Sequence, residues 1–186
     1  MEIQVPDRKA KRGRLKLALL GVFFLLPFAA SWTVWHFDLA TGVAGNYGTL
    51  LPPRPAALPP LAALKGKWVL VQFDSGRCVG ACERKHYFIR QVRRAQGKEM
   101  GRIARLWLVT DGVQPRAELL AAIEGTAIVI TPDAALAASF PPDAAVTDHI
   151  FLVDPLGNLM MRFPRDPDPS RVIKDLKHLL KVSSFG

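Results

Sequence analysis

Two cysteines, Cys78 and Cys82, are the only thiols in this 186-residue chain, and three residues separate them. They follow an apolar run, residues 68–73, and precede a stretch of helical character. A strand that leads through a turn into a helix would place both thiols at one edge of a sheet. There they could form a disulfide, exchange disulfides or bind a soft metal. A disulfide that closes so small a loop stabilises a chain only weakly. We therefore interpret the pair as functional.

Charged neighbours could tune the two thiols. Arg77 directly precedes Cys78, and together with the amino end of the following helix it would favour the thiolate. Asp74 opens the loop, and we interpret it as a turn cap. His86 stands one helical turn after Cys82 on the same side of the helix. Because basic residues surround it, we expect His86 on the surface, and we expect the basic face of residues 84–94 to be solvated.

The amino-terminal segment predicts a membrane anchor. Residues 1–16 form a basic tail with six Lys and Arg, and residues 17–37 contain no Asp, Glu, Lys or Arg. A helix needs about 20 apolar residues to cross a bilayer, and Pro27 is tolerable in such a span. A cleaved signal peptide is the alternative. The basic tail would stay in the cytoplasm. We expect a single-pass protein of a bacterial inner membrane with a periplasmic carboxy-terminal domain.

The net charge of +9 divides between the two sides of the membrane. Within residues 1–37, six Lys and Arg against two acids give +4; the remaining nineteen against fourteen give +5. A mildly basic exported part favours an acidic protein partner or anionic headgroups. Nucleic acid is not an expected partner.

The exported part divides into a tether and a folded domain. Residues 38–64 are rich in Gly and Pro, with five prolines between positions 52 and 60, which is typical of a semi-rigid spacer. Residues 65–186 predict an α/β fold with a mixed sheet flanked by helices, in the order of a thioredoxin-like fold. The expected strands cover 68–73, 105–110, 126–130, 149–153 and 159–163; the expected helices cover 80–96, 115–123, 133–140 and 170–182. We expect Phe88, Val92 and Ala95 on the buried face of the first helix and Ser170 as the cap of the last.

Two segments resemble the Sco/SenC family. The first is Lys67-Trp-Val-Leu-Val-Gln-Phe-Asp-Ser-Gly-Arg-Cys78-Val-Gly-Ala-Cys82, and the second is Asp148-His149-Ile-Phe-Leu-Val-Asp154-Pro155-Leu-Gly157. The family consists of membrane-anchored, thioredoxin-like factors that help assemble the copper site of cytochrome c oxidase. The resemblance covers about residues 65–182.

The resemblance implies a Cu(I) site made of Cys78, Cys82 and His149, and it implies the copper-bearing subunit of cytochrome c oxidase, or another envelope protein, as the partner. Two thiolates and an imidazole suit soft, low-coordinate Cu(I). The chain departs from the family pattern at Glu83, where the family normally has proline. His149 also lies about three residues closer to the hairpin glycine than the family's histidine.

Two other functions stay open. The pair could serve a thiol–disulfide reductase, with Cys78 as the attacking and Cys82 as the resolving thiol. Alternatively, the anchored domain could be a non-catalytic assembly scaffold. A metallochaperone fits the residues better than an enzyme does. The sequence contains no phosphate-binding loop and no Ser-His-Asp arrangement, so we expect neither a kinase nor a hydrolase.

Overall fold

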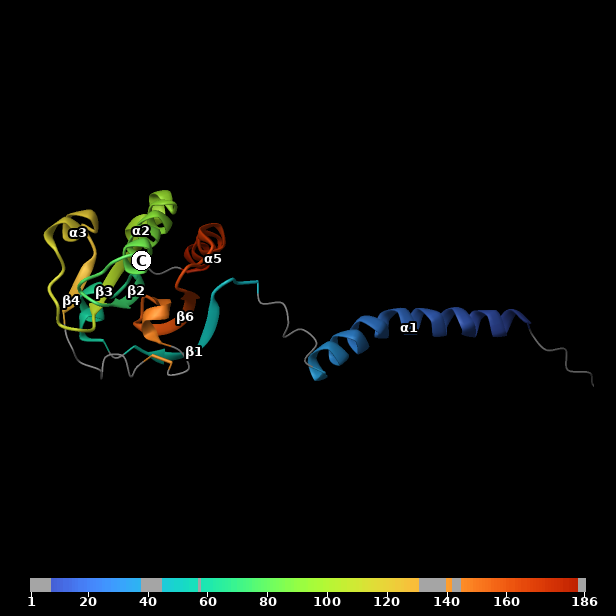
Figure 1. The fold of residues 1–186 in the computed structure, drawn as a ribbon. Helices are drawn as coiled ribbons and strands as arrows, with labels where there is room; N and C mark the ends of the chain where they lie inside the picture. The colour runs from blue at the N-terminus through green and yellow to red at the C-terminus, as the bar shows by residue number, and fades with distance from the viewer. Residues whose placement is uncertain (1–7, 38–44, 57, 131–139, 142–144, 184–186) are drawn as a thin grey trace, which may run out of the picture. The chain divides into compact units, whose positions relative to one another are not determined.

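A computed structural model describes residues 8–37, 45–56, 58–130, 140–141 and 145–183 of the chain. The chain divides into two compact units, Met1–Gly45 and Asn46–Gly186 (Figure 1).

The first unit contains one long helix, α1, from Arg8 to His36. Its stretch from Arg12 to Val34 has 23 residues and a mean hydropathy of 2.0, so it is long and apolar enough to cross a membrane. The helix begins well before the apolar run because Arg, Lys and Ala are good helix formers. The prediction of an apolar amino-terminal helix is confirmed.

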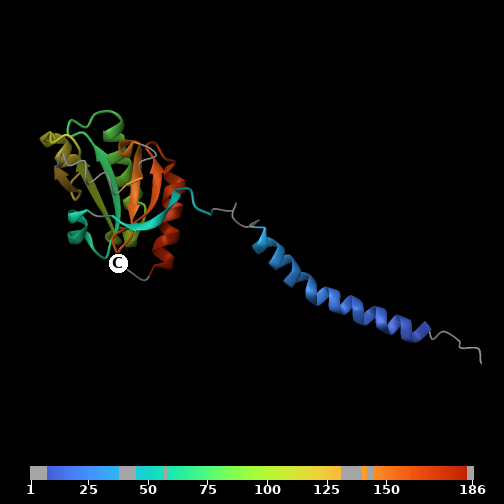
Figure 2. The same ribbon diagram turned by 90° about the horizontal axis from the view of Figure 1, so that it is seen from below.

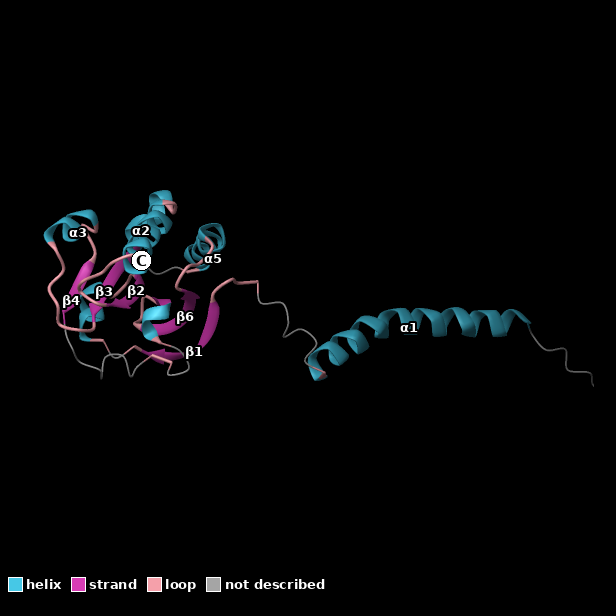
Figure 3. Cartoon of the chain, in the orientation of Figure 1, coloured by secondary structure: helices cyan, strands magenta, loops and turns pink. Residues whose placement is uncertain are grey.

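The second unit is built on a six-stranded mixed sheet with the order β1-β6-β5-β2-β3-β4. Strands β2, β3 and β4 run parallel, whereas β5, β6 and β1 join by antiparallel pairs. Figure 3 shows these strands between the helices and loops. The strands are β1 (Thr49–Pro55), β2 (Trp68–Asp74), β3 (Ile103–Val109), β4 (Ala127–Ile130), β5 (His149–Val153) and β6 (Asn158–Pro164). The predicted α/β architecture with a mixed sheet is confirmed.

Successive residues of a strand point to opposite faces of the sheet, and different elements cover the two faces. Helices α2 (Ala81–Arg94), α3 (Ala117–Ala122) and α5 (Pro169–Val182) lie on one face (Figures 1 and 2). Leu70 of β2 belongs to the core on this side, together with Ile89 of α2. The neighbouring Val71 and Phe73 point to the other face. Short 3-10 helices span Pro59–Leu64, Gly97–Arg102 and Val146–Asp148.

The expected tether over residues 38–64 is wrong from Thr49 onward. Strand β1 pairs with β6 at the edge of the sheet, where proline is tolerated because no further strand needs its missing N–H. The Asp175 carboxylate of α5 accepts hydrogen bonds from the backbone N–H groups of Tyr47 and Gly48. Leu58 and Leu61 are buried in the core below the sheet. Residues 38–44 lie outside the described part.

Three smaller expectations concern the helices. The expected helix over 133–140 falls almost entirely outside the described residues. The carboxylate of Asp168, rather than Ser170, caps α5, because it accepts hydrogen bonds from the N–H groups that open the helix. The buried face of α2 consists of Cys82, Lys85, His86, Ile89 and Val92. It thus includes Val92 as expected, whereas Ala95 is exposed and Phe88 is partly buried.

The pairing of β1 with β6 predicts that the folded domain begins before Thr49. A fragment of residues 46–186 should unfold cooperatively, whereas one of residues 65–186 should be aggregated or lack fixed tertiary structure. The shorter fragment lacks β1 and the buried side chains of Leu58 and Leu61. The burial of these two leucines contributes about 3 to 6 kcal/mol to the free energy of unfolding, which is comparable to the whole stability of a small domain. Near-ultraviolet circular dichroism of both fragments is the measurement. Equal thermal transitions would contradict this assignment of the domain boundary.

Candidate functional site

The cysteine loop, residues 75–80, connects the end of β2 to the start of α2 and is held by the carboxylate of Asp111. This carboxylate accepts hydrogen bonds from the N–H of Gly76 at 3.0 Å, from the Ser75 hydroxyl and from the N–H of Val113 at 3.1 Å. The bonds from Gly76 and Ser75 hold the pKa of Asp111 below its usual value. A Cβ at position 76 would lie 1.8 Å from the Val113 carbonyl oxygen, so only glycine fits.

Cys78 and Cys82 form a disulfide with a Cα–Cα distance of 5.1 Å. Both residues are buried, with 2% and 3% of their surface exposed, in a small core that includes Trp107 of β3 and Leu119 of α3. Cys78 has a φ of 37°, the left-handed region that side chains other than glycine rarely adopt. Gly80, with a φ of 58°, completes the turn into α2.

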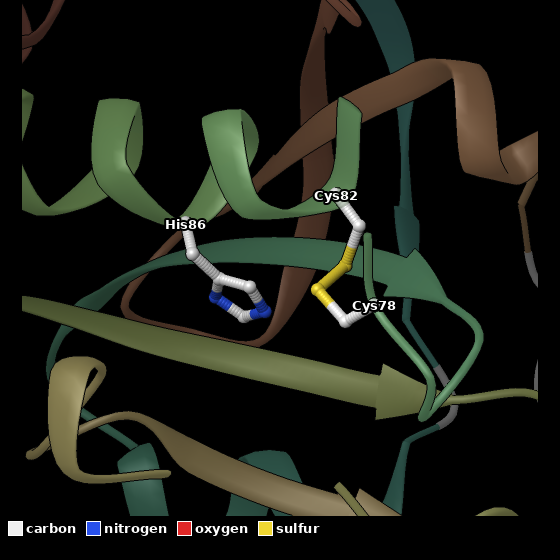
Figure 4. A group of neighbouring side chains, drawn as sticks. All are labelled: Cys78, Cys82 and His86. Carbon is white, nitrogen blue, oxygen red and sulfur yellow. A yellow bond between two sulfur atoms is a disulfide. The ribbon is translucent and has the colours of Figure 1, made fainter. Parts of the chain in front are cut away.

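The imidazole ring of His86 lies beside the disulfide and points toward the two sulfur atoms (Figure 4). The potential ligand atoms of Cys78, Cys82 and His86 all lie within 4.8 Å of one another. Only 5% of the His86 surface is exposed, so the expected surface position is wrong. The Gln72 amide nitrogen donates to Nε2 at 2.8 Å, which leaves the proton of the neutral ring on Nδ1. Trp107 contacts the ring edge to face.

The environment of His86 favours a neutral imidazole. Burial, followed by the positive charges of Lys85 and Arg105, lowers the pKa of His86 from 6.5 to about 3. The ring therefore keeps a lone pair for a hydrogen bond or a metal over the whole physiological pH range.

Lys85, the neighbour of His86, is also buried instead of solvated. Its ammonium lies 2.6 Å from the Asp74 carboxylate and donates to the carbonyl oxygens of Phe73 at 3.2 Å and Thr147 at 2.8 Å. Asp74 thus has two roles: it accepts a hydrogen bond from the N–H of Ser75, as a turn cap does, and it neutralises a buried cation.

His149 opens β5 and is not part of the cysteine–histidine group. Its ring contacts Phe151, and both side chains lie on the face of the sheet opposite α2. Nδ1 of His149 lies 3.3 Å from the Ala145 carbonyl oxygen. The assignment of His149 as a copper ligand stays a prediction. It would require this imidazole to reach the cysteines from the other face.

Four residues that the sequence analysis did not single out contribute to the site. Asp111 holds the cysteine loop, Gln72 and Trp107 contact His86, and Arg116 donates to the carbonyl oxygens of Arg77 and Cys78. Gln72 carried a usable signal, because a polar residue inside an apolar strand is informative when it is buried. Nothing in the local sequence around Arg116 indicates its contacts.

The chain was compared with known proteins. A family model described as a transmembrane-like, thioredoxin-like, C-terminal domain matches residues 68–183. Apo Sco1 from Thermus thermophilus has 21% identity, covers 72% of this chain and 96% of its own, and gives a TM-score of 0.57. Copper-bound yeast Sco1 has 13% identity, with coverages of 74% and 93% and a TM-score of 0.55. Copper-bound Bradyrhizobium japonicum ScoI has 18% identity, with coverages of 72% and 98% and a TM-score of 0.50.

These likenesses show a shared fold. The resemblance to Sco/SenC proteins that the sequence predicted is therefore confirmed in the fold. No curated protein matches the chain.

The low pKa of His86 predicts a dependence of stability on pH. The folded state binds no proton at His86 until about pH 3, whereas the unfolded state binds one below 6.5. Stability is therefore lost as pH falls through this window. Between pH 7 and pH 5, the free energy of unfolding of wild type should fall by about 2 kcal/mol more than that of His86→Gln. Guanidinium unfolding of the oxidised chain in detergent at both values measures this difference. An identical pH dependence of the two proteins would contradict it.

The buried ion pair predicts unequal effects at two neighbouring basic residues. Lys85→Met leaves Asp74 without its cation and two carbonyl groups without a donor, so it should lower the free energy of unfolding by about 3 kcal/mol. Arg84→Met is the matched control: Arg84 is exposed, so its loss should cost less than about 0.5 kcal/mol. Chemical unfolding at pH 7 compares them, and equal losses would refute the buried role of Lys85.

Proposed function

The chain belongs to the transmembrane-like, thioredoxin-like C-terminal domain family, and from this premise we propose that it is a membrane-anchored, Sco-like assembly factor. In this proposal Cys78 and Cys82 bind Cu(I) and pass it to a client, the copper centre of cytochrome c oxidase. The observation that carries the proposal is the buried group of Cys78, Cys82 and His86, with ligand atoms within 4.8 Å of one another.

The donor set suits Cu(I). Thiolate sulfur and imidazole nitrogen are ligands that soft, low-coordinate Cu(I) prefers. The sulfurs are joined in this structure, so two electrons must reduce the disulfide before either can bind a metal. Two thiolates with Cu(I) carry a net negative charge. The nearby cations Lys85 and Arg105, which disfavour protonation of His86, would favour that charge.

For the third donor we propose His86. The resemblance names His149, but the His149 ring contacts Phe151 on the opposite face of the sheet. His86 is one helical turn from Cys82, and its Nε2 carries the lone pair that Gln72 now engages. Copper bound at Nε2 would replace the hydrogen bond from the Gln72 amide.

Solved structures with a similar fold support the proposal that this chain binds copper. Yeast Sco1 and Bradyrhizobium japonicum ScoI, which share this fold, are known with copper bound. We also propose a single-pass location in a bacterial inner membrane with the domain in the periplasm, because the basic residues at the start of α1, ahead of its apolar stretch, favour a cytoplasmic amino terminus.

A thiol–disulfide reductase is the second candidate, and the disulfide itself favours it. In that reaction the Cys78 thiolate attacks a client disulfide, and the Cys82 thiolate then displaces the reduced client. The burial of both cysteines weighs against it, because an attacking thiolate must reach its client. Cys82→Ser should then trap a mixed disulfide with an envelope protein through Cys78, and under the copper proposal no adduct accumulates.

The copper proposal predicts a distinct pattern in Cu(I) affinity. The reduced full-length chain in detergent should bind one equivalent of Cu(I) in anaerobic competition with a chromogenic chelator. Cys78→Ser should abolish binding, and His86→Asn should weaken it by at least the roughly 10- to 100-fold that loss of an outer-shell partner costs, whereas His149→Asn, the matched control, should leave it unchanged. A loss of Cu(I) affinity in His149→Asn but not in His86→Asn would identify His149 as the third donor. Failure of wild type to compete with the chelator for Cu(I) would contradict the proposed copper function.

A test in cells addresses the client. If the chain supplies copper to cytochrome c oxidase, replacing Cys78 and Cys82 with serine should lower the copper content and activity of the oxidase in membranes. Normal oxidase in that strain would instead favour the scaffold alternative.

A further inference from the structure

One face of the last helix, α5, carries four exposed basic side chains and no acidic one. We call them the basic face of α5; they are Arg171, Lys174, Lys177 and Lys181. Because an α-helix turns about 100° per residue, the four lie within about 120° of its circumference. The opposite side, with Val172 and Leu176, is buried against the core. Asp175, the one acid in the helix, is also buried.

The positive charge of this face is not compensated within the described part of the chain. No described acidic side chain forms an ion pair with a lysine of the basic face. The acids around the helix have other positions or partners. Asp166 and Asp168 precede α5, and the Asp168 carboxylate caps it. Glu99, in the short 3-10 helix that contacts the end of α5, pairs with Arg102 at 3.0 Å.

The chain enters the folded domain at α5. The backbone N–H groups of Tyr47 and Gly48 donate to the Asp175 carboxylate at 2.9 and 2.8 Å. The Tyr47 hydroxyl accepts a hydrogen bond from the N–H of Asp168 at 3.2 Å, and the Arg171 guanidinium lies 4.3 Å from the centre of the Tyr47 ring. Figures 1 and 2 both show the start of the domain beside α5. The entry point is therefore fixed on the helix that carries the basic face.

The length of the chain limits how far this entry point can be from the end of the apolar helix. Helix α1 ends at His36, and Tyr47 follows it by eleven residues. Eleven residues at full extension span at most about 40 Å, which is about the diameter of a folded domain of this size. If α1 spans a membrane, the bilayer surface is always within reach of α5.

A membrane surface suits this face better than a soluble acidic protein does. Each Lys or Arg close to an anionic bilayer favours binding about fivefold. Four such residues give weak binding to a freely diffusing domain. In a tethered domain the same attraction acts at the high effective concentration that the short connection imposes. A soluble partner has no such advantage.

We propose that the basic face of α5 docks the domain onto the anionic lipid headgroups of the membrane that α1 spans. In Figures 1 and 2, α2 stands between α5 and α3. Docking through α5 thus leaves α3, and the pocket of about 300 Å³ between α2 and α3 next to the cysteine pair, open to a client. The inference rests on the proposed membrane anchor and requires no copper.

The experiment measures contact of a spin label with headgroups in the full-length chain. Because Cys78 and Cys82 are joined and the chain has no other cysteine, an introduced cysteine is the one free thiol of the oxidised protein. A nitroxide is attached at Ser170→Cys, beside the basic face, or at Ala121→Cys on α3, the control site; both positions are exposed. The chain is reconstituted in nanodiscs of phosphatidylcholine, alone or mixed equally with phosphatidylglycerol. Electron paramagnetic resonance measures collisions of the nitroxide with a nickel-chelating lipid.

We expect phosphatidylglycerol to raise the collision rate several-fold at position 170 and to leave it unchanged at position 121. Replacing Lys174 and Lys177 together with glutamine should lower the ratio of docked to undocked domain about 25-fold, about fivefold for each lysine, and so remove most of the rise. The matched control replaces Lys65 and Lys67, which are exposed in the segment before β2, and should keep it. About 0.5 M salt should abolish the rise in wild type, because it shortens the Debye length to about 4 Å.

Three results would overturn the inference. Equal collision rates at position 170 in the two bilayers would leave the basic face to an acidic protein. An equal loss in the Lys65 and Lys67 control would assign the effect to net charge instead of α5. A chain that does not stay with the nanodiscs would contradict the membrane anchor and the inference together. Failure of Cu(I) binding, by contrast, counts only against the copper function.

Discussion

The buried ion pair between Lys85 and Asp74 joins the three parts of the protein that make the site. An ammonium withdrawn from water needs a full set of partners, and Lys85 finds them in Asp74, in the Phe73 carbonyl and in the Thr147 carbonyl. These partners belong to the end of β2 and to the segment before β5. The ion pair thereby sets the rotation of α2 about its axis, and the adjacent His86 turns inward with it.

This arrangement gives the site its electrostatic character. Burial, and after it the cation beside His86, keeps the imidazole neutral, and the same cation would offset the negative charge that a reduced cysteine pair acquires. The sulfurs are enclosed by Trp107 and by Leu119 of α3. A buried site with Lys85 and Arg105 nearby suits the retention of Cu(I) by two thiolates. It is less suited to attack on a large protein disulfide, because a client must come within bonding distance of a covered sulfur.

Much of the architecture follows from local sequence patterns. The continuous apolar run of β2, the helical period of α5 and the turn at Asp154 and Gly157 depend on neighbouring residues, and all were predicted close to their observed positions. Strand β1 was missed because its prolines indicate an extended spacer. The same residues serve as an edge strand once β6 supplies a partner. The pairing of β1 with β6 joins segments about a hundred residues apart, so no local window contains it.

By itself, the sequence determined the cysteine pair, its position between strand and helix, the apolar amino-terminal helix and the mixed sheet, because these depend on residue type and short-range periodicity. Tertiary structure alone decided which imidazole adjoins the sulfurs. His86 and Lys85 look like members of a solvated basic face until Gln72 and Asp74 lie beneath them. Lys85 also needs Thr147, which is 62 residues away. Burial of a polar side chain depends on partners distant in the chain, and only folding brings them together.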